Sequence, residues 1–101
     1  MDRRWHLQAK LESILGSTNV YFQPPETIRM QYPCIVYTRR NIETIRADNR
    51  NYLSNIQYDI TLISRDPDEP VLFDLIQLDK CQYDRHYVSN GLHHDTLTLY
   101  Y

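Results

Sequence analysis

The strongest constraint on the fold lies in residues 52–65, YLSNIQYDITLISR, where apolar and polar residues alternate. Ile56, Tyr58, Ile60 and Leu62 share one face of an extended strand, and polar residues occupy the positions between them. Because successive side chains of a strand point to opposite sides, this pattern predicts one buried face and one solvated face. A strand of that kind is typical of an antiparallel sheet.

A second signal lies in residues 81–101, where a Ser89-Asn90-Gly91 turn between two β-rich segments predicts a C-terminal hairpin. A two-residue Asn90-Gly91 turn would set Tyr83 against Thr98. A three-residue turn is favoured, because it matches apolar with apolar residues and pairs opposite charges. Gly91 then takes the left-handed position of a G1 bulge. This register pairs Cys81 with Leu99, Tyr83 with Leu97, Val88 with Leu92 and Arg85 with Asp95.

The other segments predict two helices and further strands. Residues 3–16 carry a helical stripe that Gly16 can end, with Trp5 as a core or interface anchor. Residues 66–80 predict a second helix, with Asp66 or Asp68 as its N-cap and Glu69 in its first turn. The predicted buried positions of the two helices are Leu7, Leu11, Ile14, Leu15, Leu72, Leu75 and Ile76.

Residues 20–23 and 34–40 predict strands, whereas residues 41–51 are too polar for a core strand and predict a long irregular loop. The order of elements indicates an α+β fold. We expect a mostly antiparallel β-sheet flanked by two α-helices, with the C-terminal β-hairpin, in a single domain over residues 1–101.

Composition narrows the function classes. The net charge of −2 disfavours a protein whose main ligand is DNA or RNA. No apolar run approaches the roughly 20 residues that span a membrane, so we expect a soluble protein made in the cytoplasm. Cys34 and Cys81 are far apart in the chain, and we expect both to be reduced and buried.

The hairpin segment concentrates residues that could carry chemistry. Asp84, His86, His93, His94 and Asp95 are all metal-ligand types. The favoured register makes His86 and His94 cross-strand neighbours, but consecutive residues 93 and 94 point to opposite faces. Asp84 and His86 could act as an acid–base pair, yet no nucleophile motif or cofactor fingerprint accompanies them. We therefore expect a structural hairpin with no metal, no cofactor and no enzymatic activity.

Charge is distributed unevenly along the chain. Residues 39–50 carry four arginines against two acids, and residues 66–84 carry six acids against one lysine. This asymmetry indicates either two solvated faces or two surfaces that guide docking. Two isoleucines among the charges favour a contact surface. The candidate interface residues are Arg39, Arg40, Ile42, Ile45, Arg46, Asp48, Arg50, Asp66, Asp68 and Glu69.

Three segments together resemble a known family. They are YPCIVYTRRNIETIRADNRNY, YDITLISRDPDEP and CQYDRHYVSNGLHHDTLTLYY, and they match the family pattern in order and spacing over residues 32–101. The family comprises small proteins of long-tailed phages and prophages of Gram-positive bacteria, described as minor capsid, tail completion or head–tail joining proteins. The chain is similar in this respect to tail terminators of the lambda type.

The resemblance implies a homohexameric ring in the virion, at the head–tail interface. Such a ring caps the tail tube, stops its polymerisation and presents a surface to the head connector or head-completion protein. No cofactor and no enzymatic activity are implied. A head-closure or connector-adaptor protein of the same virion is an alternative. A small metal-binding regulatory domain and a nuclease are alternatives from other classes.

Overall fold

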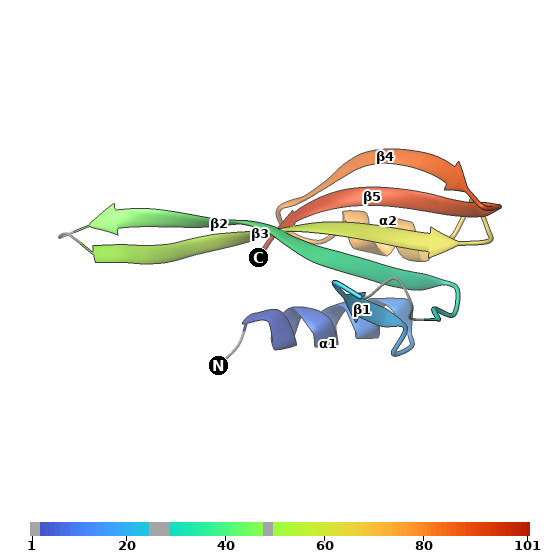
Figure 1. The fold of residues 1–101 in the computed structure, drawn as a ribbon, viewed down its shortest axis with the longest axis horizontal. Coiled ribbons are helices and arrows are strands. Elements are labelled where there is room, and N and C mark those ends of the chain that lie inside the picture. Colours follow the sequence, from blue (N-terminus) through green and yellow to red (C-terminus); the bar gives the residue numbers. More distant parts are fainter. Residues whose placement is uncertain (1–2, 25–28, 48–49) are drawn as a thin grey trace.

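A computed structural model of the chain describes residues 3–24, 29–47 and 50–101 (Figure 1). It contains a five-stranded sheet in the order β1-β2-β3-β5-β4. Strand β1 runs parallel to β2, and every other neighbouring pair is antiparallel. The predicted α+β class is therefore confirmed. The elements are α1 (Arg3–Leu15), β1 (Val20–Phe22), β2 (Cys34–Ala47), β3 (Arg50–Ser64), α2 (Val71–Ile76), β4 (Cys81–Ser89) and β5 (Leu92–Tyr100).

The core lies between one face of the sheet and the two helices. All four apolar residues of the alternating segment in β3 are buried, as predicted. They pack in one cluster with Leu7 and Leu11 of α1, Leu75 of α2, and Leu97 and Leu99 of β5. Both helices therefore cover the same face, and the other face of the sheet carries the polar residues of the alternation.

Helix α1 agrees with the sequence. Leu7 and Leu11 are fully buried, and Gly16 (φ +80°) donates its N–H to the carbonyl of Glu12 at 2.8 Å. The conformation of Gly16 is the left-handed one that ends many helices. Trp5 is not a core residue, because 59% of it is exposed and the Arg4 guanidinium lies 4.4 Å from its ring centroid.

Helix α2 is shorter than predicted. Pro70 stands at its N-cap and makes no side-chain cap, so the prediction that Asp66 or Asp68 caps the helix is wrong. Asp66 instead accepts the backbone N–H of Asp68 at 2.9 Å, which closes a turn before the helix. Leu75 is buried as expected, whereas Ile76 is 38% exposed because the helix ends there.

The prediction of an irregular loop over residues 41–51 is wrong. Residues 41–47 continue β2, and β3 begins at Arg50, so the two strands form one long antiparallel hairpin. Alternation of apolar and polar residues could not predict strands over residues 41–51. The paired strands extend past the helices here, so neither face of the described part of the hairpin is buried against them. Backbone pairing continues from the buried half of the hairpin into the polar half.

The β4–β5 hairpin combines the two registers considered for it. Its turn has two residues, Asn90 (φ 53°) and Gly91 (φ 73°), and Ser89 pairs with Leu92. A β-bulge between Tyr83 and Arg85 then shifts the register by one residue. Toward the base, Cys81 pairs with Leu99 and Tyr83 with Leu97, as predicted.

The two-residue turn has consequences for the predicted charge pair. Arg85 pairs with Thr96, and His86 takes the place opposite Asp95, so the predicted Arg85–Asp95 pair is wrong. The predicted Val88–Leu92 pair is wrong for the same reason, since Val88 lies opposite His93. The Arg85 guanidinium instead lies 5.0 Å from the ring centroid of Tyr87. Gly91 has the predicted left-handed conformation.

Candidate functional site

The two strands of the long hairpin project beyond the rest of the sheet (Figure 1). We call this projection, residues 41–47 and 50–55, the β2–β3 arm. Strand β5 pairs with β3 from Gln57 to Ser64, and Tyr101 continues the pairing to Ile56. The arm strands pair with each other beyond that point, and the molecule extends 51 × 26 × 23 Å. Strands β2 and β3 carry all of the predicted basic interface residues, Arg39, Arg40, Arg46 and Arg50.

A β-bulge marks the base of the arm. Arg39 pairs with Tyr58 and Asn41 pairs with Gln57, so Arg40 is the extra residue between them. Arg40 Nε lies 2.9 Å from Asp59 Oδ2, and this predicted interface residue is thus paired within the chain. Both side chains are exposed enough that the pair contributes about 0–1 kcal/mol.

The bulge also sets the orientation of the apolar residue on the arm. Ile42 lies directly opposite Ile56, whose side chain belongs to the core face. Residues directly opposite in an antiparallel pair share a face, so Ile42 continues the apolar face past the helices. Ile42 is 47% exposed there. Ile45 belongs to β2, but its side chain lies outside the described part of the structure, as does all of Asp48.

The acidic interface candidates lie in the loop between β3 and α2. Asp66 and Asp68 are exposed. Ser64 Oγ donates to Glu69 Oε2 at 3.2 Å and accepts the N–H of Asp66 at 3.0 Å. These bonds, with the Asp66–Asp68 turn, hold the loop in one conformation. The loop therefore presents two carboxylates to solvent at a defined place. We call residues 65–70 the acidic loop.

The arm and the acidic loop lie at opposite ends of the long axis (Figure 1). The arm points away from the sheet at one end, and β3 delivers the chain to the acidic loop at the other. The arm and the acidic loop are therefore too far apart to contact each other within one chain. Two copies placed end to end would bring them together.

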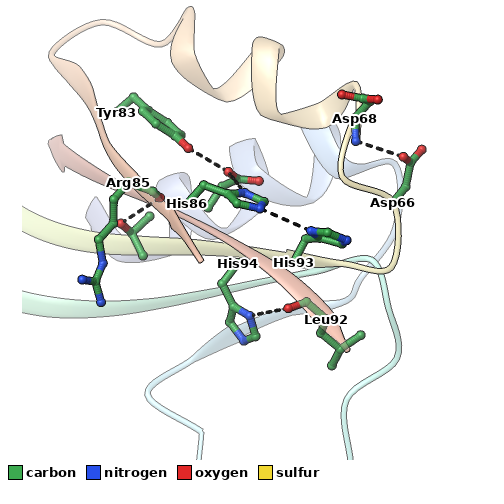
Figure 2. A network of polar contacts seen from close by, with 10 residues as sticks. Asp66, Asp68, Tyr83, Arg85, His86, Leu92, His93 and His94 are labelled. Carbon is green, nitrogen blue, oxygen red and sulfur yellow. Dashed lines mark hydrogen bonds and ion pairs between the residues drawn. The ribbon is translucent and has the colours of Figure 1, made fainter. Parts of the chain in front are cut away.

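A polar network occupies the β4–β5 hairpin on the face that carries the helices (Figure 2). Asp95 is 4% exposed, and its Oδ1 accepts the Tyr83 hydroxyl at 2.9 Å. His86 Nδ1 lies 2.7 Å from the same oxygen. His86 Nε2 lies 3.3 Å from His93 Nδ1. The sequence identified these residue types, but their contacts depend on the two-residue turn, whose register sets His86 opposite Asp95.

The contacts of the network indicate the tautomer of His86. Since a carboxylate accepts from both neighbours, Nδ1 of His86 carries a hydrogen, and Nε2 faces His93. Desolvation of the phenol, together with the hydrogen bond to Asp95 and the charge of that carboxylate, raises the pKa of Tyr83 to about 12. Asp95 thus holds one imidazole and one phenol in fixed positions.

His94 does not belong to this network. It lies opposite Tyr87 on the other face of the hairpin, with ring centroids 4.7 Å apart in a stacked arrangement. Its Nδ1 donates to the carbonyl of Leu92 at 3.0 Å. The predicted His86–His94 neighbourhood is therefore wrong, and the two histidines that meet are His86 and His93.

The network resembles part of a catalytic arrangement, since a buried carboxylate orients an imidazole. The free nitrogen of His86 faces another imidazole, however, where a nucleophile-activating base would face a hydroxyl or thiol. Asp84 is engaged elsewhere, accepting the Thr98 hydroxyl at 2.7 Å. Among the described residues, no group of three or more His, Cys, Asp or Glu is arranged to hold a metal ion.

A hollow of about 540 Å³ lies on the sheet face opposite the helices. Asp59 lies in it, with Oδ2 on Arg40 and with a buried Oδ1 that has no hydrogen-bond partner among the described residues. Alternation predicted a polar face here but not its concavity, which the twist of the strands produces. The lining residues are Thr38, Arg40, Asp59, Thr61, Asp84, Arg85, Thr96, Leu97 and Thr98.

The two cysteines are free thiols. Cys34 is buried at the start of β2, and this burial raises the pKa of its thiol to about 11. Cys81 is half-buried, and burial followed by the charge of Asp84 raises its pKa. Both shifts favour the protonated thiol near neutral pH, whereas the thiolate is the nucleophilic form.

No protein-family profile, curated protein or solved structure matches the chain. Neither helix in the described part of the chain has the length and apolar character needed to cross a membrane.

Proposed function

We propose that this protein is a ring-forming tail terminator of a long-tailed phage, which caps the tail tube and presents a docking surface to the head. The observation that supports this best is the placement of a basic arm and an acidic loop at opposite ends of one subunit. A closed ring needs such a pair of different surfaces, because each copy contacts the next through unlike patches.

The arm has the features of an inserting element. A strand of seven residues, such as 41–47, extends roughly 23 Å. Arg46 and Arg50 are exposed on it, and Ile42 offers apolar surface at its base. On the neighbouring copy, Asp66 and Asp68 are exposed at the far end. Opposite charges at the two surfaces accelerate docking and fix which ends meet.

Charge reversal tests this contact. Arg46→Glu with Arg50→Glu should reduce the ring to smaller species at low salt, measured by native mass spectrometry and electron microscopy. Adding Asp66→Lys and Asp68→Lys to the same chain should restore the ring, because both surfaces then carry reversed charge. Arg29→Glu, at an exposed position outside the arm, is the matched control. An unchanged ring mass after reversal of the arm would refute the contact.

The head-closure alternative is separated by a binding-order experiment. A terminator binds the ends of purified tail tubes first, whereas a head-closure protein binds tail-less capsids first. Incubation of the labelled protein with each particle, followed by sedimentation, distinguishes the two. Binding to capsids alone would transfer the proposal to the head-closure role.

A further inference from the structure

The contact between His86 and His93 has the geometry of a half-formed metal site. His86 Nε2 and His93 Nδ1 are 3.3 Å apart, and the ring centroids are 5.3 Å apart with an interplanar angle of 31°. We propose that these two imidazoles bind a divalent transition-metal ion of the zinc type on the rim of the β4–β5 hairpin. This inference is independent of ring formation.

The separation of the two nitrogens matches a shared ligand position. Two imidazole nitrogens that each bind one tetrahedral zinc at about 2.05 Å lie about 3.3 Å apart. Their ring centroids then lie about 5.2 Å apart, given the size of an imidazole ring. Both values agree with those of His86 and His93. A metal ion can therefore replace the hydrogen between the two nitrogens with little movement of either ring.

The remaining nitrogen of His86 is already oriented as in known metal sites. A metal-binding histidine usually donates its other N–H to a carboxylate, which fixes the tautomer and raises ligand basicity. His86 Nδ1 makes this bond to Asp95 Oδ1 at 2.7 Å. The Tyr83 hydroxyl donates to the same oxygen at 2.9 Å and holds the carboxylate in place. The chain thus supplies two ligands and the partner that orients one of them.

The site is open on the solvent side. His86 has 38% of its side chain exposed, and the described residues offer no third ligand in place. The other coordination positions are therefore filled by water or by a donor from another molecule. On binding, the hydrogen of His93 moves from Nδ1 to Nε2 by exchange with solvent, so that both rings stay neutral. Affinity falls as the pH is lowered, because protons compete with the metal ion for the two ligand nitrogens.

Isothermal titration with ZnCl₂ on the full chain tests the proposal. One zinc ion per chain is expected for the wild type, with at least tenfold weaker binding in His86→Ala and in His93→Ala. His94→Ala is the matched control, since His94 lies on the other face of the same hairpin. Asp95→Asn keeps both ligands and should weaken binding by about 10–100-fold through loss of orientation.

Imidazole ¹⁵N spectra of the wild type make the test independent of whether the variants fold. Zinc should shift Nε2 of His86 and Nδ1 of His93 and leave both nitrogens of His94 unchanged. Equal zinc affinity in the wild type and in the His86→Ala/His93→Ala double variant would overturn the proposal. Shifts confined to the rings of His6 or His94, or no shift at saturating zinc, would overturn it as well.

Discussion

The β4–β5 hairpin has one strand packed against the helices for most of its length, whereas the β2–β3 hairpin leaves the helices at Arg40 and continues as the arm. Strand β5 buries Leu97 and Leu99, and a tight Asn90-Gly91 turn closes its hairpin. The arm exposes Ile42 and has polar sequence on both strands. An isolated two-stranded hairpin is marginally stable in water, so the arm depends on the buried half of the same strands.

The difference shows how one sheet can combine a buried body with a projecting hairpin. Register is set where a face is buried, and hydrogen bonding transmits it along the strands into the polar part. We expect the arm to contribute less to the free energy of folding than the body does, because Ile42 is half-exposed there.

The largest expected effect comes from truncation in the body. Leu97→Ala should lower the free energy of unfolding by about 2–5 kcal/mol, because it creates a cavity beside fully buried neighbours. Ile42→Ala should lower it by less than about 1 kcal/mol, since its side chain is half-exposed. Urea unfolding of the monomer measures both. Equal losses would show that the arm is as much part of the core as β5.

The next effect concerns the polar contacts of the two hairpins. Asp95→Asn should cost about 1–3 kcal/mol, because a buried carboxylate that accepts two hydrogen bonds is replaced. Arg40→Gln removes the exposed ion pair at the base of the arm and should cost less than about 1 kcal/mol. Thermal unfolding at neutral pH compares the two variants. A larger loss of stability in Arg40→Gln than in Asp95→Asn would show that the polar contacts of the β2–β3 hairpin stabilise the fold more than those of the β4–β5 hairpin.

The turn of the β4–β5 hairpin gives a smaller effect. Gly91→Ala should cost about 1–2 kcal/mol, because a left-handed conformation is unfavourable for a residue with a Cβ. No atom lies within 4 Å of a Cβ built at Gly91, so the cost is conformational and not a clash. Asn90→Gly, at the preceding left-handed position, is the control and should be nearly neutral. Chemical unfolding of the two variants decides between strain and packing.

The smallest effect appears only in alkali. The folded pKa of Tyr83 is raised to about 12, above the ordinary value of 10 that the unfolded chain has. Its contribution to stability is therefore complete below pH 10 and is lost as the pH rises toward 12. Tyr83→Phe should remove this part of the decline in stability between pH 10 and pH 12. Unfolding measurements at several alkaline pH values test this. An identical decline in both proteins would contradict the role of the Asp95 contact.

The body could be predicted from the sequence because burial leaves a pattern. The alternation from Ile56 to Leu62 placed the central strand, and the leucines of α1 placed the first helix. Residues 41–51 carry no such pattern, because neither solvated face of a ribbon requires apolar residues. Their strand structure follows from pairing alone, which single-sequence periodicity does not detect.

The candidate site was predicted in part for a related reason. The Asn-Gly turn and the apolar pairs at the base of the β4–β5 hairpin each indicated a register, and the two registers differ by one residue. Both exist, because the bulge between Tyr83 and Arg85 joins them. The choice of the three-residue register for the whole hairpin led to Arg85–Asp95 and to His86–His94. The two-residue register, which holds between the turn and the bulge, sets His86 opposite Asp95 and next to His93.

The bulge at Arg40 gives the arm a property that the body lacks. Deletion of this one residue would leave every pairing from Cys34 to Arg39 unchanged and keep Ile42 opposite Ile56, because the ladder closes regularly across the gap. The bend and the extra twist that a bulge gives a strand would be lost. Chains that differ by a single codon in β2 would thus share one body and one pairing of the arm, but their arms would point in different directions.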